Sequence, residues 1–514
     1  MTEQAEKAKL EEGWRRHRTG DRDGAETLYR QVVAENPQNL EALRRLAFLL
    51  GQKREFLESE RLLERAIQLR PTADALFLRA YTLQMLARYE ESIACLDRAL
   101  ELNRDMKEAI LNRASVLFAL RRYEEAAADY QRLLKLDPDS PFARGNRLFC
   151  RLHCCDWREL AEDRALVLAG LGRGMPVIAP FDGKAIGLSP AQELHCARIW
   201  VTSQCPASDP LWRGERYAHK RIRIAYLSAN FHQHAVAHVL AGVLESHDDE
   251  FETFGLSFGP DDKSAMRARI ASSCSHFLDV REKSDFDIAR LIREREIDIA
   301  VDLMGFTEGC RPGILAQRPA PVAVNYLGFP GTMGAEYIDY VIADRTVIPG
   351  QEETDYAEKL VFLPGAYLPA PHPVQTGSVL SRTDAGLPPD GFVFCSFNAP
   401  YKITPEMFGV WMRLLAGVKR SVLWLAQSNP NAIENLKRAA EERGIARERV
   451  IFAHYQARIE DHMARLRLAD LFVDTSPYNA HVTALDALSA GVPVLTLPGS
   501  SFAGRVAASL VKTL

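Results

Sequence analysis

A motif near the end of the chain has the residue types and spacing to bind an anion. The apolar run DLFVDTS leads into a turn at residues 477–480, and His481, Val482 and Thr483 then begin a predicted helix. The first backbone N–H groups of a helix lack partners and lie at the positive end of its dipole, so they attract groups such as a nucleotide diphosphate. Thr483 offers a hydroxyl donor, and Asp486 follows on the same helix. Ordinary helix capping is the alternative interpretation.

Three further cationic or polar side chains have a chemical interpretation. Lys402 comes directly after the run FCSFNAPY, where its charge could stabilise a departing diphosphate without a metal ion. A solvated surface lysine is the alternative. His462 and Arg465 are three residues apart, and this spacing predicts that they share one face of a helix. Both could instead be ordinary exposed helix residues.

A group of histidines follows the run RIRIAYLSA, at positions 232, 234 and 238. Their spacing could suggest a metal site, but the sequence fixes no carboxylate beside them. Because histidine titrates near neutral pH, His234 could transfer a proton. It could equally act only by holding a substrate in place. The residues leave these two roles open.

These residues follow two series of short apolar runs, which are the strands that would position them. The first series includes RIRIAYLSA, ETFGLSFG, IDIAVDLMG, VAVNYLGFPG and YVIAD; the second includes FVFCSFN, SVLWLAQ, RVIFAHY, DLFVDTSP and VPVLTLPG. Runs that are apolar throughout are typical of strands buried on both faces of a parallel sheet. The two series predict two Rossmann-like domains, residues 220–385 and 386–514, with ligands beyond the carboxyl ends of the strands.

The first part of the chain is a repeat array. Segments beginning NPQNLEAL, RPTADALF, NRDMKEAI and DPDSPFAR start 33 or 34 residues apart, and Ala80 and Ala114 occupy equal places. This period predicts an α-solenoid of tetratricopeptide repeats (TPR) over residues 1–150, with four units between about 7 and 138. Such arrays bind extended peptides, so protein or peptide partners are expected. Residues 151–219 are interpreted as a helical bridging segment.

Composition weighs against several other partners. The chain has 514 residues and a net charge of -4, which weakens nucleic acid or an anionic membrane as the main partner. Its apolar runs are shorter than a bilayer span requires, and the charged N-terminus does not look like a secretory signal, so a cytoplasmic protein is predicted. Nine cysteines in a chain of this length predict no disulfide framework.

Long motifs resemble one enzyme family. LSANFHQHAVAHVL, NYLGFPGTMGAEYIDYVIAD, FCSFNAPYKITPEMF and SPYNAHVTALDALSAGVPVLTLPG occur in this order and look like the catalytic region of protein O-GlcNAc transferases. That family joins TPRs to a two-Rossmann glycosyltransferase of the GT-B type. The resemblance implies UDP-GlcNAc as the donor, protein serine or threonine as the acceptor, inversion at the anomeric carbon, and no metal or other cofactor.

The resemblance also implies roles for individual residues. It assigns Lys402 to the leaving diphosphate, places His462 against the uridine and Arg465 near the base, and gives Asp486 the ribose hydroxyls. It implies His234 as the acid–base candidate.

Other assignments from the resemblance concern the first Rossmann-like domain. His276 matches another active-site histidine of the family. The segment LGFPGTMG, residues 327–334, is implied to lie beside the sugar and diphosphate. The residues expected to contribute there are Leu327, Gly328, Pro330, Gly331 and Thr332. A tight structural turn is the alternative, because glycines also allow close backbone packing.

Some positions depart from the family pattern. Ala399, Val482 and Ile459 stand where the resembled enzymes often have glutamine, threonine and lysine, which predicts weaker donor affinity. The alternatives are therefore a GDP-fucose-dependent protein O-fucosyltransferase of the Spindly type, or an inactive TPR scaffold. The sequence reaches FAGRVAASLVKTL soon after the last recognised motif, so the second Rossmann-like domain is expected to be C-terminally incomplete.

Overall fold

The computed structural model of the chain describes residues 3–370, 377 and 381–514. The chain divides into two compact units, residues 1–150 and 151–514. The first unit consists of helical repeats, and the second contains two parallel sheets covered by helices. The predicted fold class, a TPR solenoid followed by two Rossmann-like sheets, is confirmed.

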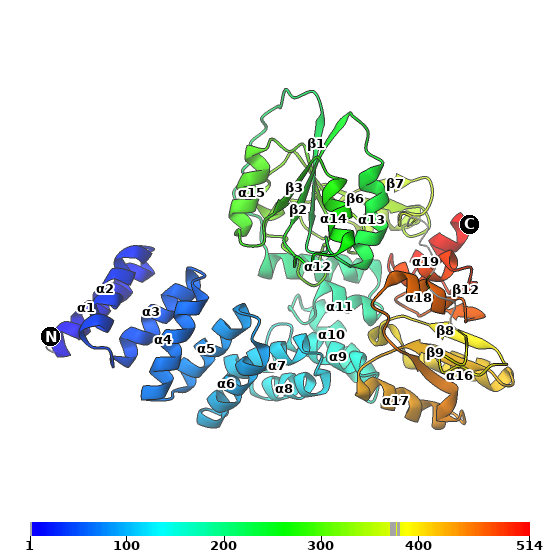
Figure 1. Cartoon of the computed structure of the whole chain (residues 1–514), viewed down its shortest axis with the longest axis horizontal. Coiled ribbons are helices and arrows are strands. Elements are labelled where there is room, and N and C mark those ends of the chain that lie inside the picture. The colour runs from blue at the N-terminus through cyan, green and yellow to red at the C-terminus, as the bar shows by residue number, and fades with distance from the viewer. Residues whose placement is uncertain (1–2, 371–376, 378–380) are drawn as a thin grey trace. The chain divides into compact units, whose positions relative to one another are not determined.

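The first unit is built from antiparallel helix pairs (Figure 1). Ala80 and Ala114, which recur at equal places in the sequence, are fully buried where neighbouring helices pack. The helices are α1 (Glu3–Arg18), α2 (Arg22–Glu35), α3 (Leu40–Gln52), α4 (Phe56–Leu69), α5 (Ala73–Met85), α6 (Tyr89–Leu102), α7 (Lys107–Ala119) and α8 (Tyr123–Leu136).

The turn within each helix pair has the same backbone conformation. Gly20, Arg54, Ala87 and Arg121 lie between the two helices of successive repeats and have φ angles of 90°, 64°, 57° and 60°. This left-handed region favours glycine, yet only the first repeat has glycine there. The positive φ therefore recurs in each of these turns, although the residue type differs.

Four helices lie in or begin just before residues 151–219, the segment interpreted from the sequence as a bridge. They are α9 (Ala143–His153), α10 (Leu160–Gly172), α11 (Pro180–Ala185) and α12 (Pro190–Gln204). Helix α12 begins at a capping box, in which the Ser189 and Gln192 side chains each bind the backbone N–H of the other residue. Pro190 occupies the first helical position, where its missing N–H costs nothing.

The first sheet has seven parallel strands in the order β3-β2-β1-β4-β5-β6-β7. Its strands are β1 (Ile222–Ser228), β2 (Phe251–Ser257), β3 (His276–Asp279), β4 (Ile299–Asp302), β5 (Val322–Asn325), β6 (Tyr340–Asp344) and β7 (Lys359–Leu363). Helices α13 (Ala235–Glu245), α14 (Ala265–Ser272) and α15 (Asp285–Glu294) connect them. The chain reverses its direction across the sheet between β1 and β4, which makes that position a switch point.

The second sheet has five parallel strands in the order β10-β9-β8-β11-β12. Its strands are β8 (Val393–Ser396), β9 (Val422–Ala426), β10 (Val450–Ala453), β11 (Leu471–Val473) and β12 (Val494–Leu495). Its helices are α16 (Pro405–Gly417), α17 (Pro430–Glu441), α18 (Ile459–Leu466), α19 (Val482–Ser489) and α20 (Val506–Thr513). Here the switch point lies between β8 and β11.

The two sheets share one apolar core. A single cluster of buried side chains includes Tyr226 and Val301 from the first sheet and Cys395 and Trp424 from the second. Helix α20 also joins the two, because its Ser509 hydroxyl donates to the Asp344 carboxylate at 2.6 Å. The two carboxyl edges are therefore parts of one packed body.

Candidate active site

A buried carboxylate shapes the turn before α19. Asp474, directly after β11, accepts hydrogen bonds from the backbone N–H of Thr475 at 2.7 Å and of Ala480 at 2.6 Å, and from the Thr496 hydroxyl at 2.6 Å. Burial raises the pKa of Asp474 to about 6. We call residues 475–480 the α19 turn. Sequence reasoning missed Asp474, although an acidic residue directly after an apolar strand was the available signal.

The residues that open α19 follow this turn. The imidazole Nε2 of His481 lies 3.2 Å from the Ala503 carbonyl oxygen, and burial, followed by the nearby charge of Lys402, lowers its pKa well below the ordinary value. The imidazole is therefore neutral near pH 7. The Thr483 hydroxyl donates to the Asn398 side-chain oxygen at 2.7 Å. Its proton is thus already used, whereas the sequence suggested a donor open to a ligand.

Lys402 is buried against the α19 turn. It ends the short 3-10 helix Pro400–Lys402 after β8 and is only 8% exposed, so the alternative of a solvated surface lysine is wrong. Its ammonium donates to the Asn479 carbonyl at 3.0 Å and lies 3.9 Å from the centre of the Tyr478 ring. Burial lowers the pKa of Lys402 to about 7, against the opposing influence of Asp474.

His462 and Arg465 lie in direct contact on α18, so the predicted shared face is confirmed. The Arg465 guanidinium nitrogens Nε and Nη2 lie 3.1 Å and 2.8 Å from His462 Nδ1. The other ring nitrogen of His462 is 3.6 Å from a carboxylate oxygen of Asp486 on α19. Arg465 also lies over the Phe397 ring, and burial lowers its pKa to about 10. These contacts join α18, α19 and the strand β8 end.

His234 opens α13 at the switch point of the first sheet. Its Nδ1 accepts a hydrogen bond from the Val236 backbone N–H at 3.2 Å. Burial, aided by His232 and His238, lowers its pKa to about 4, so the ring is neutral near pH 7. A neutral ring that accepts at Nδ1 carries its proton on Nε2. In this arrangement His234 offers a hydrogen-bond donor rather than a free base.

His238 connects this helix to the second sheet. Its Nε2 lies 3.1 Å from the Gln233 side-chain nitrogen, and burial lowers its pKa. Asp486 opposes that shift, which places the α19 carboxylate within electrostatic reach of α13. The Asp486 carboxylate is thus 3.6 Å from His462 and near enough to His238 to influence its pKa.

His276 does not join this group, in contrast to the expectation from the resemblance. It is the first residue of β3, whereas the other candidates follow the carboxyl ends of strands. Its Nε2 lies 2.9 Å from a carboxylate oxygen of Glu252, and its ring stacks on Phe254 with 4.5 Å between centres. The structure therefore shows His276 at the amino end of the four-residue strand β3, with Glu252 and Phe254 as its contacts, and its role in the site stays a prediction.

Residues 327–334 form what we call the glycine loop, and most of its expected ligand contacts are made to protein instead. Leu327 is buried and has a φ of 71°. A Cβ on Gly328 would lie 2.0 Å from the Leu303 carbonyl oxygen, and one on Gly331 would lie 2.6 Å from Lys184 Nζ. The close approaches that require glycine here are therefore contacts within the protein.

Two other residues of the glycine loop face inward. Pro330 and Thr332 are buried. The Thr332 hydroxyl donates to the Glu358 carboxylate at 2.7 Å and accepts from the Gly334 backbone N–H at 3.0 Å. The Thr332 hydroxyl thus has protein partners as donor and as acceptor, and the expected contact with a sugar or diphosphate stays a prediction.

Helix α11 reaches the same region, which sequence reasoning did not foresee. The Phe181 ring lies 6.1 Å from the Tyr401 ring and 6.2 Å from the Tyr478 ring, and a Cβ on Gly187 would lie 2.9 Å from Pro477. The signal in the sequence was the segment MPVIAPFDGKAIGLSP, whose glycines and prolines alternate with apolar residues. These contacts bring the bridging segment against the α19 turn.

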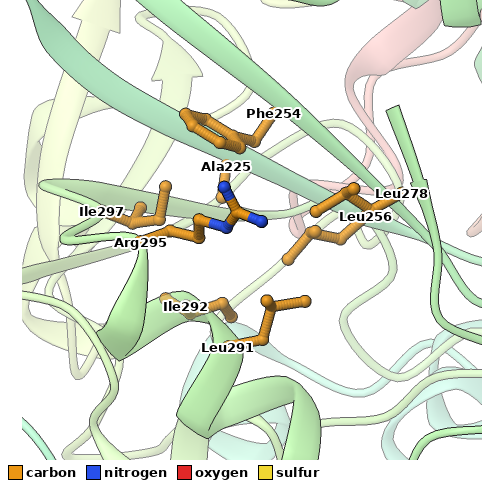
Figure 2. A pocket seen from close by; sticks show the side chains of 8 residues that line it. All are labelled: Ala225, Phe254, Leu256, Leu278, Leu291, Ile292, Arg295 and Ile297. Atoms are coloured by element: carbon orange, nitrogen blue, oxygen red, sulfur yellow. The ribbon is translucent and has the colours of Figure 1, made fainter. Parts of the chain in front are cut away.

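A crevice shown in Figure 2 lies on the first sheet, and its wall includes Phe254, the ring that stacks on His276. It is lined by apolar side chains of β1, β2, β3 and α15, with Arg295 across it, and is too narrow to admit a water molecule. Among the residues that the structure describes, no three His, Cys, Asp or Glu side chains are grouped to hold a metal ion. Within the same residues, no helix is long and apolar enough to cross a membrane.

Comparison with known families assigns both units. Residues 209–376 and 370–514 match the profile of glycosyl transferase family 41, and residues 10–74 and 78–141 match the tetratricopeptide repeat. A mutant of the O-GlcNAc transferase of Thermobaculum terrenum has a similar structure, with a TM-score of 0.66 and 28% identity; the match covers 92% of this chain and 85% of that one.

Curated plant proteins are also similar. The probable UDP-N-acetylglucosamine–peptide N-acetylglucosaminyltransferase SEC of Arabidopsis thaliana is 35% identical over 386 residues, which cover 70% of this chain and 39% of that protein. The probable enzyme of the same description named SPINDLY, from the same plant, is 30% identical and covers 69% and 38%. The chain thus spans about two fifths of the length of these relatives.

Proposed function

The chain belongs to glycosyl transferase family 41, and from that premise we propose that it transfers N-acetylglucosamine from UDP-GlcNAc to serine or threonine hydroxyls of proteins. The observation that carries this proposal is the convergence of Lys402 and the α19 N-terminus at one switch point. A buried ammonium beside unpaired backbone N–H groups is suited to a diphosphate. The names of the similar plant proteins contain this donor and a peptide acceptor.

The second sheet provides the donor end of the proposed reaction. The diphosphate binds at the start of α19, and Lys402 turns from the Asn479 carbonyl toward it. An incoming anion raises the pKa of Lys402 and so keeps the ammonium charged. The His462 and Arg465 pair contacts the uridine, while the Asp486 carboxylate accepts from the ribose hydroxyls. No metal ion is required, because this charge and the helix dipole already favour the leaving group.

The first sheet provides the sugar and acceptor end. The acceptor hydroxyl oxygen forms a bond to the anomeric carbon, the bond from that carbon to the phosphate oxygen breaks, and UDP departs with its electron pair. This single displacement inverts the anomeric configuration. His234 donates from Nε2 to hold a reacting group, because its Nδ1 already accepts from Val236. The acceptor proton passes to water or to the departing phosphate.

The repeat array binds the acceptor protein in the proposed reaction. Arrays of this kind present a continuous surface to extended peptides, and each repeat adds to its length. Helices α1 to α8 therefore bind segments of protein acceptors, which the second unit glycosylates.

One set of measurements tests the proposal. Calorimetry compares UDP, GDP, UDP-GlcNAc and GDP-fucose, and a radiolabel assay follows sugar transfer to a peptide with and without EDTA. We expect tighter binding of UDP than of GDP, and transfer that survives EDTA. Preference for GDP and GDP-fucose would replace the proposal with an O-fucosyltransferase. Absence of any nucleotide binding would leave the scaffold interpretation.

A further inference from the structure

We propose that Lys184 is a positioning residue of the donor site, where Glu193 holds it between the glycine loop and the α19 turn. No motif singled out this residue, which lies in the segment interpreted from sequence as a bridge. The inference rests on the proposed function, since it concerns how that donor site is kept in shape.

The first observation is a buried ion pair within the bridging helices. The Lys184 ammonium on α11 lies 2.8 Å from a carboxylate oxygen of Glu193 on α12. Both side chains are almost inaccessible, with exposures of 1% and 6%. Buried pairs of this kind cost desolvation energy and often add little to stability, although some contribute to a unique geometry. The presence of this buried ion pair is therefore better explained by a role in positioning than by a contribution to stability.

The second observation is that the ammonium supports the glycine loop. Lys184 Nζ lies 4.6 Å from the centre of the Phe329 ring, a cation–π contact. It also occupies the space beside Gly331, where a Cβ would come within 2.6 Å of Nζ. On the other side, the Asn325 side-chain nitrogen donates to the Gly331 carbonyl at 3.2 Å. The loop is therefore fixed between the end of β5 and the Lys184 side chain.

The third observation is that α11 and the segment that follows it contact the α19 turn of the second sheet. Phe181 and Gly187, three residues on either side of Lys184, pack against Tyr478 and Pro477 of the α19 turn. The charge of Lys184 also helps, after burial and Lys402, to lower the pKa of His481. Lys184 is thus anchored in α11, one helix that contacts loops from both sheets.

These contacts define what removal of the pair should do. UDP is expected to contact mainly the second sheet, whereas the sugar of UDP-GlcNAc lies between the two carboxyl edges. Loosening the glycine loop should therefore weaken binding of the sugar nucleotide while leaving UDP binding intact. A purely structural pair would instead change both affinities together, or neither.

The test uses the whole chain with a neutral double variant, Lys184→Met with Glu193→Gln. Changing both partners avoids leaving one buried charge unpaired, which is the strongly destabilising case. We expect the dissociation constant and KM for UDP-GlcNAc to rise about tenfold, with kcat changed less and the dissociation constant for UDP within about twofold of wild type. The matched control, Arg113→Met with Asp129→Asn, neutralises an ion pair of the repeat unit and should leave both affinities unchanged.

Other outcomes overturn the inference. Unchanged UDP-GlcNAc affinity in a folded double variant would make the pair merely structural, and an equal loss for UDP would mean that it acts through the whole fold. If the double variant does not fold, Gly331→Ala decides, because its Cβ would crowd Lys184 Nζ at 2.6 Å and Glu193 Oε2 at 3.3 Å while both charges remain. Normal UDP-GlcNAc affinity of that variant would then refute the role. A wild-type chain that binds no UDP-GlcNAc would refute the proposed function together with this inference.

Discussion

The two switch points of the second unit differ in their electrostatic character. At the second sheet, Lys402 and Arg465 are buried cations whose pKa values burial lowers, and α19 adds the positive end of its dipole. At the first sheet, His234 and His238 are neutral rings whose pKa values are also lowered, so they contribute no charge near pH 7. The candidate residues at the two edges thus differ in charge: two buried cations at the second sheet and two neutral rings at the first.

This difference gives each sheet a separate task in the proposed reaction. Charge develops on the departing diphosphate, so a fixed cation near it favours the transition state over the bound substrate. A hydroxyl acceptor and a sugar ring carry no charge before reaction, and neutral donors such as His234 Nε2 suit them. The comparison therefore predicts large effects from changes at the second edge and smaller ones at the first.

The largest expected effect is on turnover. Lys402→Met removes the ammonium and keeps a side chain of similar length, so kcat should fall by about a hundredfold or more because the leaving group loses its charge partner. Single-turnover assays at saturating donor measure this directly. Lys437→Met, in α17 of the same domain, is the matched control and should leave kcat unchanged. Near-normal turnover of the Lys402 variant would contradict the prediction that changes at the second sheet affect activity more than changes at the first.

The same substitution should stabilise the protein at neutral pH. Below pH 7 Lys402 is charged in both folded and unfolded states, so its burial cost, on the order of a few kcal/mol, is fully present. Between about 7 and 10.5 the unfolded chain binds more protons than the folded one, and this cost decreases as pH rises. Denaturant melts from pH 6 to 10 should show Lys402→Met more stable than wild type, by a margin that narrows with pH. A margin independent of pH would contradict the lowered pKa.

A smaller effect is expected at the first edge. His234→Ala removes one neutral donor, which should lower kcat/KM about tenfold. The pH profile of kcat/KM should keep its shape, because a donor does not titrate in this range whereas a general base would contribute a limb. His234→Gln, which keeps an N–H donor, should recover part of the loss. If His234→Ala lowered kcat/KM by more than a hundredfold and changed its pH profile, His234 would be the general base instead.

The smallest effect on function is expected at Thr332, whose side chain faces inward from the glycine loop. Thr332→Val keeps the side-chain shape and removes the hydroxyl that binds Glu358. Donor affinity should change by less than about twofold, while unfolding free energy falls by about 1–3 kcal/mol since a buried carboxylate loses a partner. Calorimetry and denaturant melts on the same variant give both values. A marked loss of donor affinity with normal stability would place Thr332 in the site after all.

The sequence predicted those parts of the molecule that depend on local pattern. A 34-residue period and runs of apolar residues were enough for the solenoid and both sheets, because burial on both faces leaves no polar alternation. The sequence also placed Lys402 after the strand β8 and His481 after the strand β11, and parallel strands bring their carboxyl ends to one edge.

The remaining parts depend on contacts between distant segments. Lys184 meets Gly331 from nearly 150 positions earlier in the chain, and no local pattern encodes that meeting. The position of His276 at the amino end of β3 was not foreseen, because a motif match does not say which end of a strand a residue occupies. The hydrogen bond from Thr332 to Glu358 was not foreseen either, because the two residues lie in different segments.

The shared left-handed turn of the helix pairs has a consequence for how this chain can change in length. Gly20, Arg54, Ala87 and Arg121 present the same backbone geometry at intervals of one repeat. Deleting or duplicating the chain between two such points would rejoin ends that already match in direction. The length of the repeat array can therefore change by whole repeats through duplication or recombination. Such a change alters no residue of the candidate active site.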